Sequence, residues 1–154
     1  MFKKILFPID FSENVNRVVP YVHSLSEKYH ALIDVVYVAR ELTKYGEIHA
    51  PGDAVVAYMS GIQEQAETLM EDYISQHFKG MPSASGQVLL GDPVEEIINY
   101  AKNNEIDLII MGTHGRKGLD RVILGSVAEN VTRSSHVPVM TVNPYLVKRA
   151  QAPS

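Results

Sequence analysis

Short runs of apolar residues alternate along the chain with longer stretches in which apolar residues recur every three or four positions. The short runs are rich in Ile, Leu and Val, which is typical of strands in a parallel sheet covered by helices on both faces. They predict five strands, at Lys4–Ile9, Leu32–Val38, Gln87–Leu90, Asp107–Met111 and Pro138–Val142.

The stretches between these runs predict four helices. The first begins at Ser12 and contains Pro20, which removes a backbone donor and predicts a kink or a locally widened turn. The third begins after Asp92, with Pro93 in its first turn and Glu95 placed for a capping box. The second and fourth are expected over about 55–79 and 125–134. The expected buried stripe of the second is Met59, Ile62, Ala66, Leu69, Tyr73 and Ile74.

This alternation of strands and helices predicts an α/β fold: a single domain with an open parallel five-stranded sheet and helices on both faces, Rossmann-like in outline. The chain has 154 residues, which suits one core. We expect the domain to span 1–144 and residues 145–154 to form a frayed tail. The long connection 40–54 contains Gly46, Pro51 and Gly52 and is interpreted as a lid or a partner surface.

Composition removes several classes of function. A net charge of −4 provides no basic footprint, so nucleic acid is not expected as a partner. There is no cysteine, which excludes disulfides, thiolate metal sites and a cysteine nucleophile. The apolar run after Lys3 and Lys4 is too short for a signal peptide, and no run is long enough to span a bilayer. We therefore expect a cytoplasmic protein without membrane insertion.

The segment with the clearest chemistry is 111–126, MGTHGRKGLDRVILGS, between the fourth strand and the last helix. Its glycines let backbone N–H groups converge without side chains in the way, and a helix N-terminus adds positive potential. A phosphate chain fits such a loop. The glycines are Gly112, Gly115, Gly118 and Gly125, and the polar residues among them are Thr113, His114, Arg116, Lys117 and Ser126.

Glycines that only turn the chain are the alternative interpretation of this loop. The spacing is neither a P-loop, because no Gly-Lys-Ser/Thr occurs, nor a G-x-G-x-x-G fingerprint. It reads instead Gly112-x₂-Gly115-x₉-Gly125-Ser126. This pattern resembles that of the universal stress protein family, in its ATP-binding branch.

The resemblance covers almost the whole chain. KKILFPIDFSE is similar to the first strand and turn of that family, VVYVARE to its second strand, and GDPVEEII to its third strand-to-helix junction. VILGSVAENVTRSSHVPVMTV is similar to its last helix and strand. The resemblance implies an adenine nucleotide alpha hydrolase-like fold, ATP as a bound ligand and a role in stress response.

The resemblance also implies roles for single residues. Pro8 and Asp10, with Ile9 between them, would border the adenosine pocket, and Val38 would offer its backbone to the adenine edge. Ribose and phosphates would pass the loop after the fourth strand, and the helix N-terminus would hold the phosphates. The loop residues are Met111, Gly112, Thr113, His114, Gly115, Arg116 and Gly118, and those at the helix are Gly125, Ser126 and Val127.

Two side chains in this set have a plain structural alternative. Asp10 can act as a turn residue before Ser12 because Asp bonds nearby backbone donors readily. His114 is the one histidine of six in the predicted site, where it could donate to a phosphate. The six show no ligand spacing for a protein-bound metal. Mg²⁺ is expected only with the triphosphate, since it keeps several waters and takes few protein ligands.

The last strand is expected at an edge of the sheet, where unpaired backbone invites a two-fold partner. A homodimer through Pro138–Val142 is therefore predicted, and the family resemblance implies the same; a regulatory protein partner is also expected. Three functions follow: a nucleotide-responsive regulatory module that holds ATP as a ligand, a slow ATPase or self-phosphorylating enzyme, or an interaction protein that binds AMP, cyclic AMP or no nucleotide. The first is favoured because no general base is identified for phosphoryl transfer.

Overall fold

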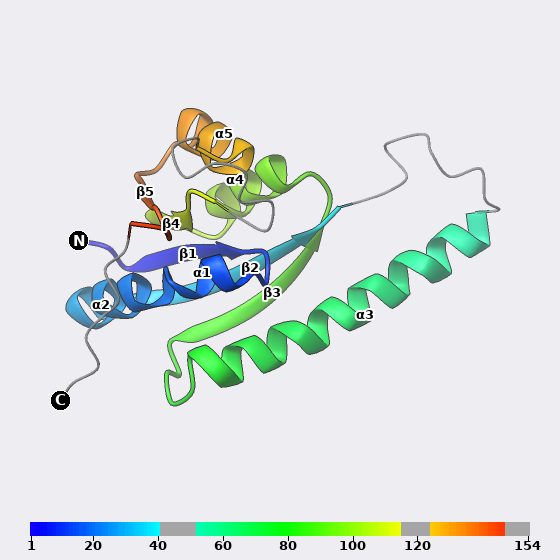
Figure 1. Ribbon diagram of the computed structural model, residues 1–154, viewed down its shortest axis with the longest axis horizontal. Helices are drawn as coiled ribbons and strands as arrows, with labels where there is room; N and C mark the ends of the chain where they lie inside the picture. Colours follow the sequence, from blue (N-terminus) through cyan, green and yellow to red (C-terminus); the bar gives the residue numbers. More distant parts are fainter. Residues whose placement is uncertain (41–51, 115–123, 147–154) are drawn as a thin grey trace.

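A computed structural model describes residues 1–40, 52–114 and 124–146, and the fold below refers to these residues. Five parallel strands form one sheet in the order β3-β2-β1-β4-β5 (Figure 1). The strands are β1 (Lys4–Ile9), β2 (Leu32–Ala39), β3 (Ala84–Leu90), β4 (Leu108–Gly112) and β5 (Val139–Val142). The helices are α1 (Glu13–Asn16), α2 (Val19–Tyr29), α3 (Gly52–His77), α4 (Pro93–Asn103) and α5 (Ser126–Ser134).

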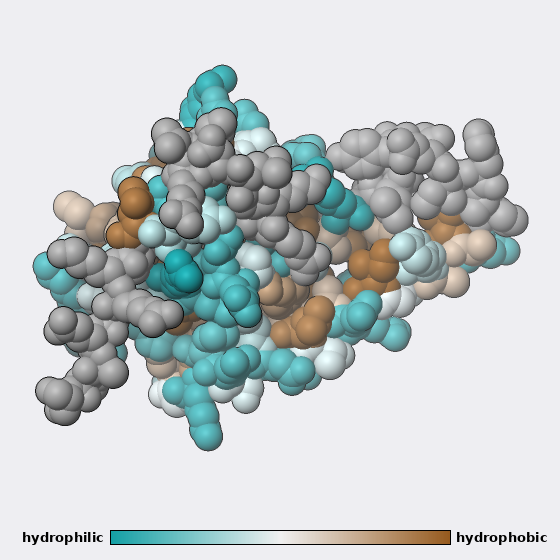
Figure 2. All heavy atoms as spheres, viewed as in Figure 1, coloured by the Kyte–Doolittle hydropathy of each residue, from teal (hydrophilic) through white to brown (hydrophobic). Residues whose placement is uncertain are grey.

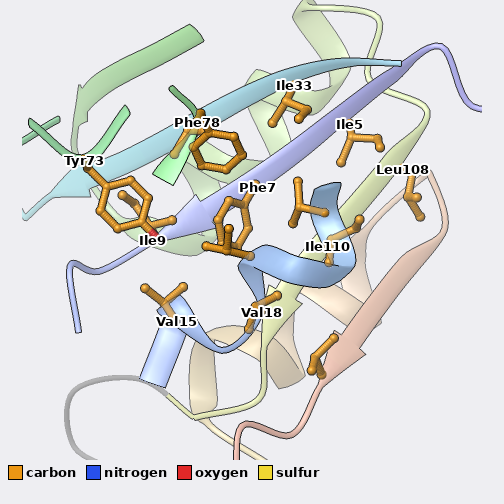
Figure 3. Packing of buried hydrophobic residues seen from close by; sticks show 14 of the residues in the cluster. Ile5, Phe7, Ile9, Val15, Val18, Ile33, Tyr73, Phe78, Leu108 and Ile110 are labelled. Carbon is orange, nitrogen blue, oxygen red and sulfur yellow. The ribbon is translucent and has the colours of Figure 1, made fainter. Parts of the chain in front are cut away.

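The predicted fold class is confirmed, with helices on both faces of the sheet. Alternate residues of β1 enter two separate cores, because successive side chains of a strand point to opposite faces. Ile5, Phe7 and Ile9 pack under α1, α2 and α3 (Figure 3). Leu6 packs under α4 and α5, beside Val36 and Val38 of β2. No helix in the described part of the chain is long and apolar enough to cross a bilayer.

The predicted first helix is in fact two helices. α1 ends at Asn16, and Pro20 lies in the first turn of α2, where its missing N–H is no loss. Val15, Val18, Val19 and Val22, which recur at helical spacing, are all buried. The proline therefore begins a second helix and does not kink a continuous one.

The later elements fall close to their predicted positions, with two corrections. Asp92 caps α4 as expected, because its carboxylate accepts the backbone N–H of Glu95 at 3.0 Å. In α3 the prediction for Leu69 is wrong: its side chain is 45% exposed, and Met70 is buried in its place. β3 begins at Ala84, earlier than predicted, and Gly86 within it lies so close to the Met70 side chain that a Cβ there would clash.

A polar network joins the sheet to α4 near the amino ends of the strands. Asp34 is buried near the start of β2, and its carboxylate lies 3.0 Å from the Lys4 ammonium. It also accepts the hydroxyl protons of Tyr100 at 2.9 Å and Ser85 at 3.3 Å. The network therefore connects β1, β2, β3 and α4, and it neutralises a charge that burial would otherwise penalise.

Candidate functional site

The carboxyl ends of β1 and β4 lie side by side at the point where the strand order reverses (Figure 1). Ile5 pairs with Leu108 and Leu6 with Ile109, so continuation of this register sets Ile9 beside Gly112. Ligands of open α/β sheets bind in the crevice beyond such a switch point. The predicted residues of the β1 end and of the β4 end are thus brought together.

Asp10 and Ser12 form a tight turn after β1. The Asp10 carboxylate accepts both the backbone N–H of Ser12, at 3.0 Å, and its side-chain hydroxyl. Phe11 between them adopts a positive φ of 58°. The turn role weighed from the sequence is therefore present, and it holds the carboxylate at the mouth of the switch point.

Pro8 and Ile9 are the last two residues of β1, and Val38 lies next to the end of β2 at the same edge of the sheet. The side chain of Ile9 packs into the core under α1, α2 and α3, whereas Val38 packs into the opposite core. Since Ile9 pairs with Tyr37, the next residue Val38 lies level with Asp10 on the neighbouring strand. Backbone of β2 is thus placed beside the β1 turn; its contact with adenine stays a prediction.

The end of β4 is tied to the start of α5 through backbone atoms. The N–H of Gly125 donates to the carbonyl of Thr113 at 2.7 Å. A Cβ on Gly125 would lie only 2.7 Å from that carbonyl oxygen. Gly125 is therefore required for this close approach, and it is the N-cap of α5. The N-terminus of α5 opens at the same edge as the β1 turn.

Ser126 and Val127 form the first turn of α5. Ser126 is exposed and Val127 is half-buried, and the first backbone bond of the helix runs from Glu129 N–H to the Gly125 carbonyl. The N–H groups that precede Glu129 have no carbonyl partner within the helix, as at every helix start. Together with the helix dipole they can bind an anion.

Thr113 and His114 are both buried, at 8% and 6% exposure. The Thr113 hydroxyl lies 2.7 Å from Nδ1 of His114, and the His114 ring packs edge-on against Tyr145 at 5.1 Å between centroids. The structure therefore buries His114 in contact with other protein groups. Donation from His114 to a phosphate stays a prediction.

Met111 and Gly112 complete the described part of the β4 end. Met111 is buried in the core under α4 and α5. A Cβ on Gly112 would lie 3.4 Å from the side chain of Val18, the N-cap of α2, which is an ordinary van der Waals contact. Gly115, Arg116 and Gly118 lie outside the described residues, as does Lys117.

Two features of this edge were missed from the sequence. The first is the segment after β5: Arg17 donates to the Pro144 carbonyl at 2.9 Å, and Asn14 donates to the Tyr145 hydroxyl at 3.4 Å. Tyr145 belongs to the segment predicted to fray, and residues 147–154 lie outside the described residues. Only the aromatic character of Tyr145 could have hinted at this contact.

The second is an aromatic group beneath Asp10. Phe11 packs against Tyr37 at 4.6 Å and against Tyr73 of α3 at 6.0 Å between ring centroids. The Tyr73 hydroxyl is buried without a hydrogen-bond partner among the described residues. Its burial, and secondly the negative charge of Asp10, raise the pKa of Tyr73 above its ordinary value. Asp10 therefore faces both the turn and this phenol.

No group of three or more acidic or histidine side chains is arranged to hold a metal ion within 1–40, 52–114 and 124–146. The described edge instead offers a helix N-terminus, a carboxylate and main-chain groups. The helix N-terminus and main-chain N–H groups can bind an anion, whereas the carboxylate can only accept hydrogen bonds from hydroxyl or amino groups of a ligand.

Comparison with known proteins gives the family. The sequence model of the universal stress protein family matches residues 1–143. The chain belongs to the universal stress protein family. Among its relatives, universal stress protein MJ0577 of Methanocaldococcus jannaschii is 29% identical over 155 aligned positions, covering 92% of this chain and 95% of that protein. MJ0531 of the same organism is 27% identical over 143 residues, covering 92% and 82%.

Solved structures of family members share the fold. The structure of MJ0577 superposes with a TM-score of 0.79 at 31% identity and covers 92% of this chain and 96% of that chain. Two more distant members, at 19% and 16% identity, were solved in complex with cAMP and with dAMP, the latter from Archaeoglobus fulgidus; their TM-scores are 0.59 and 0.63. At these identities the likeness concerns the fold alone.

Proposed function

We propose that this universal stress protein binds ATP as a ligand at the carboxyl edge of β1 and β4 and acts as a nucleotide-responsive module in stress response. The observation that carries the proposal is the junction of β4 and α5. There the Gly125–Thr113 backbone bond aims a helix N-terminus at the switch point of the sheet. The spacing Gly112-x₂-Gly115-x₉-Gly125-Ser126 spans this junction.

Each part of the edge has a role in this proposal. Pro8, Ile9 and Asp10 border the adenosine, and Val38 presents its backbone to the adenine edge. The first turn of α5, at Gly125, Ser126 and Val127, receives the phosphates. The ribose and phosphates lie along residues Met111 to Arg116 and Gly118. Mg²⁺ accompanies the triphosphate and keeps most of its ligands as water.

A thermal-melting titration tests the proposal. Mg-ATP should raise Tm progressively with concentration, because a ligand that binds only the folded state stabilises it by RT ln(1 + [L]/Kd). AMP, cyclic AMP and inorganic phosphate are run in parallel. A Tm that does not move at millimolar Mg-ATP contradicts the proposal.

Ser126→Asp separates ligand binding from folding. Ser126 is exposed, and a carboxylate in the first turn of a helix interacts favourably with the dipole, so the apo protein should keep or gain stability. The same charge repels a phosphate and should abolish the Mg-ATP shift. Ser126→Asn is the matched uncharged control and should keep most of the shift. Equal shifts in both variants would place the phosphates elsewhere.

A nucleoside monophosphate is the second candidate ligand, because two family structures hold cAMP and dAMP. Mass spectrometry of small molecules released from freshly purified protein distinguishes the candidates. Recovered ATP supports the proposal, and AMP or cyclic AMP supports the alternative. Incubation with ATP followed by the same measurement shows whether ADP accumulates, which would support slow hydrolysis in place of a ligand role.

Assembly and location complete the proposal. β5 is an edge strand, and an exposed edge is satisfied by a second copy related by two-fold symmetry. We expect a homodimer through Pro138–Val142, a regulatory protein as the further partner, and a cytoplasmic location. Sedimentation of the wild-type protein tests the dimer directly.

A further inference from the structure

The segment after β5 forms a tight turn that its own sequence favours. Asn143 and Pro144 occupy the first two positions, where these residue types are common in β-turns. The N–H of Leu146 donates to the Asn143 carbonyl at 3.2 Å, and the N–H of Tyr145 donates to Asn143 Oδ1 at 3.0 Å. The turn is thus closed by main chain and side chain together, which fixes where the Tyr145 side chain leaves the backbone.

Polar contacts bind this turn to the region of α1. Arg17, the C-cap of α1, donates to the Pro144 carbonyl at 2.9 Å, and Asn14 of α1 donates to the Tyr145 hydroxyl at 3.4 Å. Figure 2 shows hydrophilic side chains over α1. The turn therefore joins the end of β5 to the first helix, and Tyr145 has bonded partners at both its backbone and its hydroxyl.

The ring of Tyr145 contacts the ring of His114. The two centroids are 5.1 Å apart and the planes cross at 72°, an edge-on geometry that aromatic pairs favour. His114 is buried, and its Nδ1 lies 2.7 Å from the Thr113 hydroxyl. A rotation of the imidazole would break one of these two contacts.

Thr113 connects the His114 ring to the start of α5. Its N–H donates to the Val142 carbonyl at 3.0 Å, and its carbonyl accepts the N–H of Gly125, the N-cap of α5, at 2.7 Å. Thr113 is 8% exposed and so lies in a close-packed interior, where a side chain has little room to shift alone. One residue thus contacts the end of β5, the His114 ring and the helix N-terminus.

We propose that Tyr145 is a positioning residue for the proposed nucleotide site. Its ring fixes the imidazole of His114, His114 fixes Thr113, and Thr113 fixes the Gly125 N–H at the start of α5. The ligand part of this inference rests on the proposed function, whereas the positioning is a property of the unliganded chain. A tyrosine that only covered the core would stabilise the fold without acting on Gly125 in particular.

Amide hydrogen exchange of the unliganded full chain tests the positioning. Tyr145→Ala should speed exchange of the Gly125 N–H by about tenfold, because the amide opens locally when its acceptor is no longer fixed. Tyr145→Phe keeps the ring and should stay within about twofold of the wild type. Phe2→Ala is the matched control, because it removes an edge-on pair with Tyr29, at 5.2 Å and 83°, from the amino end of the sheet. It should leave Gly125 exchange unchanged.

Mg-ATP binding to the same variants tests the consequence at the site. Isothermal titration calorimetry should give a Kd raised about tenfold in Tyr145→Ala, because a displaced helix start matches the phosphates less well. Tyr145→Phe and Phe2→Ala should both bind within about twofold of the wild type.

Arg17→Met is a second variant with little risk to folding, because Arg17 is exposed. It removes the bond to the Pro144 carbonyl and leaves Tyr145 itself in place. Gly125 exchange should rise by about threefold, less than in Tyr145→Ala. An unchanged rate would show that the docked turn does not control Gly125, and the proposal would be wrong.

Three further results would overturn the proposal. Gly125 exchange in Tyr145→Ala could equal that of the wild type, or Phe2→Ala could speed it as much. Tyr145→Phe could behave as Tyr145→Ala does, which would assign the effect to the hydroxyl and not to the ring. If the wild type binds no Mg-ATP, the proposed function fails, and the exchange rates of Gly125 still decide whether Tyr145 positions α5.

Discussion

The two ends of the sheet handle polar groups in opposite ways. At the amino end, Asp34 is buried and surrounded by its own partners, Lys4, Tyr100 and Ser85. At the carboxyl end, the side chains Asp10 and Thr113 bond close neighbours, while a helix start faces outward from Gly125. At the amino end, side-chain partners satisfy the buried carboxylate and hold the strands in register. At the carboxyl end, the helix start presents main-chain N–H groups, which can bind a ligand.

Asp34→Ala should have the largest effect and should test the amino end. It leaves the Lys4 ammonium and the Tyr100 hydroxyl without their acceptor, and we expect a loss of about 3 kcal/mol in the free energy of unfolding. Urea denaturation measures this loss. The Mg-ATP shift should persist in the folded fraction. If the shift vanished while the fold remained, the two ends would be coupled and the comparison would fail.

Gly125→Ala should have the second largest effect, at the carboxyl end. Its methyl group would lie 2.7 Å from the Thr113 carbonyl oxygen and would push α5 away from β4. We expect a loss of about 2 kcal/mol in unfolding free energy. The Mg-ATP shift in Tm should fall with it, unlike in Asp34→Ala. Gly61→Ala is the matched control, because nothing lies within 4 Å of its Cβ position.

Tyr73→Phe should have a smaller effect of opposite sign. The Tyr73 hydroxyl is buried and has no partner in the described part of the chain, so its removal should stabilise the protein by about 1 kcal/mol. The raised pKa of Tyr73 also makes stability decline above pH 10, because the unfolded chain ionises there and the folded chain does not. The variant should decline less steeply. Denaturation at neutral and alkaline pH checks both effects.

His77 should contribute the smallest effect. Burial, and secondly the nearby His23, lower the pKa of His77 below its ordinary value. The unfolded chain therefore binds a proton that the folded chain resists, and stability should decline slightly as the pH falls below about 6.5. His77→Gln should flatten this decline in melting curves from neutral to mildly acidic pH. An unchanged slope would show that other groups cause it.

The fold could be predicted from the sequence because its signals are local. Runs such as Lys4–Ile9 are apolar at every buried position, and Asp92-Pro93 with Glu95 marks a helix start without tertiary information. The break between α1 and α2 was missed, because proline suits both a kink within one helix and the first turn of a new one. The helical spacing favoured Leu69 over Met70 as a buried residue. Which of the two is buried depends on where the sheet lies against the helix, and the sequence does not show that.

The candidate site could be predicted only in outline. Glycine spacing located the junction at Gly125, because a close approach between two backbone segments requires a glycine, which can be read directly from the sequence. The burial of His114 and its contact with Tyr145 depend on where the segment after β5 runs. The same holds for Tyr73, which reaches Phe11 from a distant helix. Pairings across the fold such as these leave no periodic signal in one sequence.

The contact of Tyr145 has a practical consequence for where this domain ends. The family match stops at residue 143, yet Pro144 and Tyr145 bond Arg17 and Asn14 and cover the ring of His114. A protein truncated at the family boundary would uncover a histidine that is 6% exposed in the full chain. A truncated version should therefore keep Pro144 and Tyr145 and end after them.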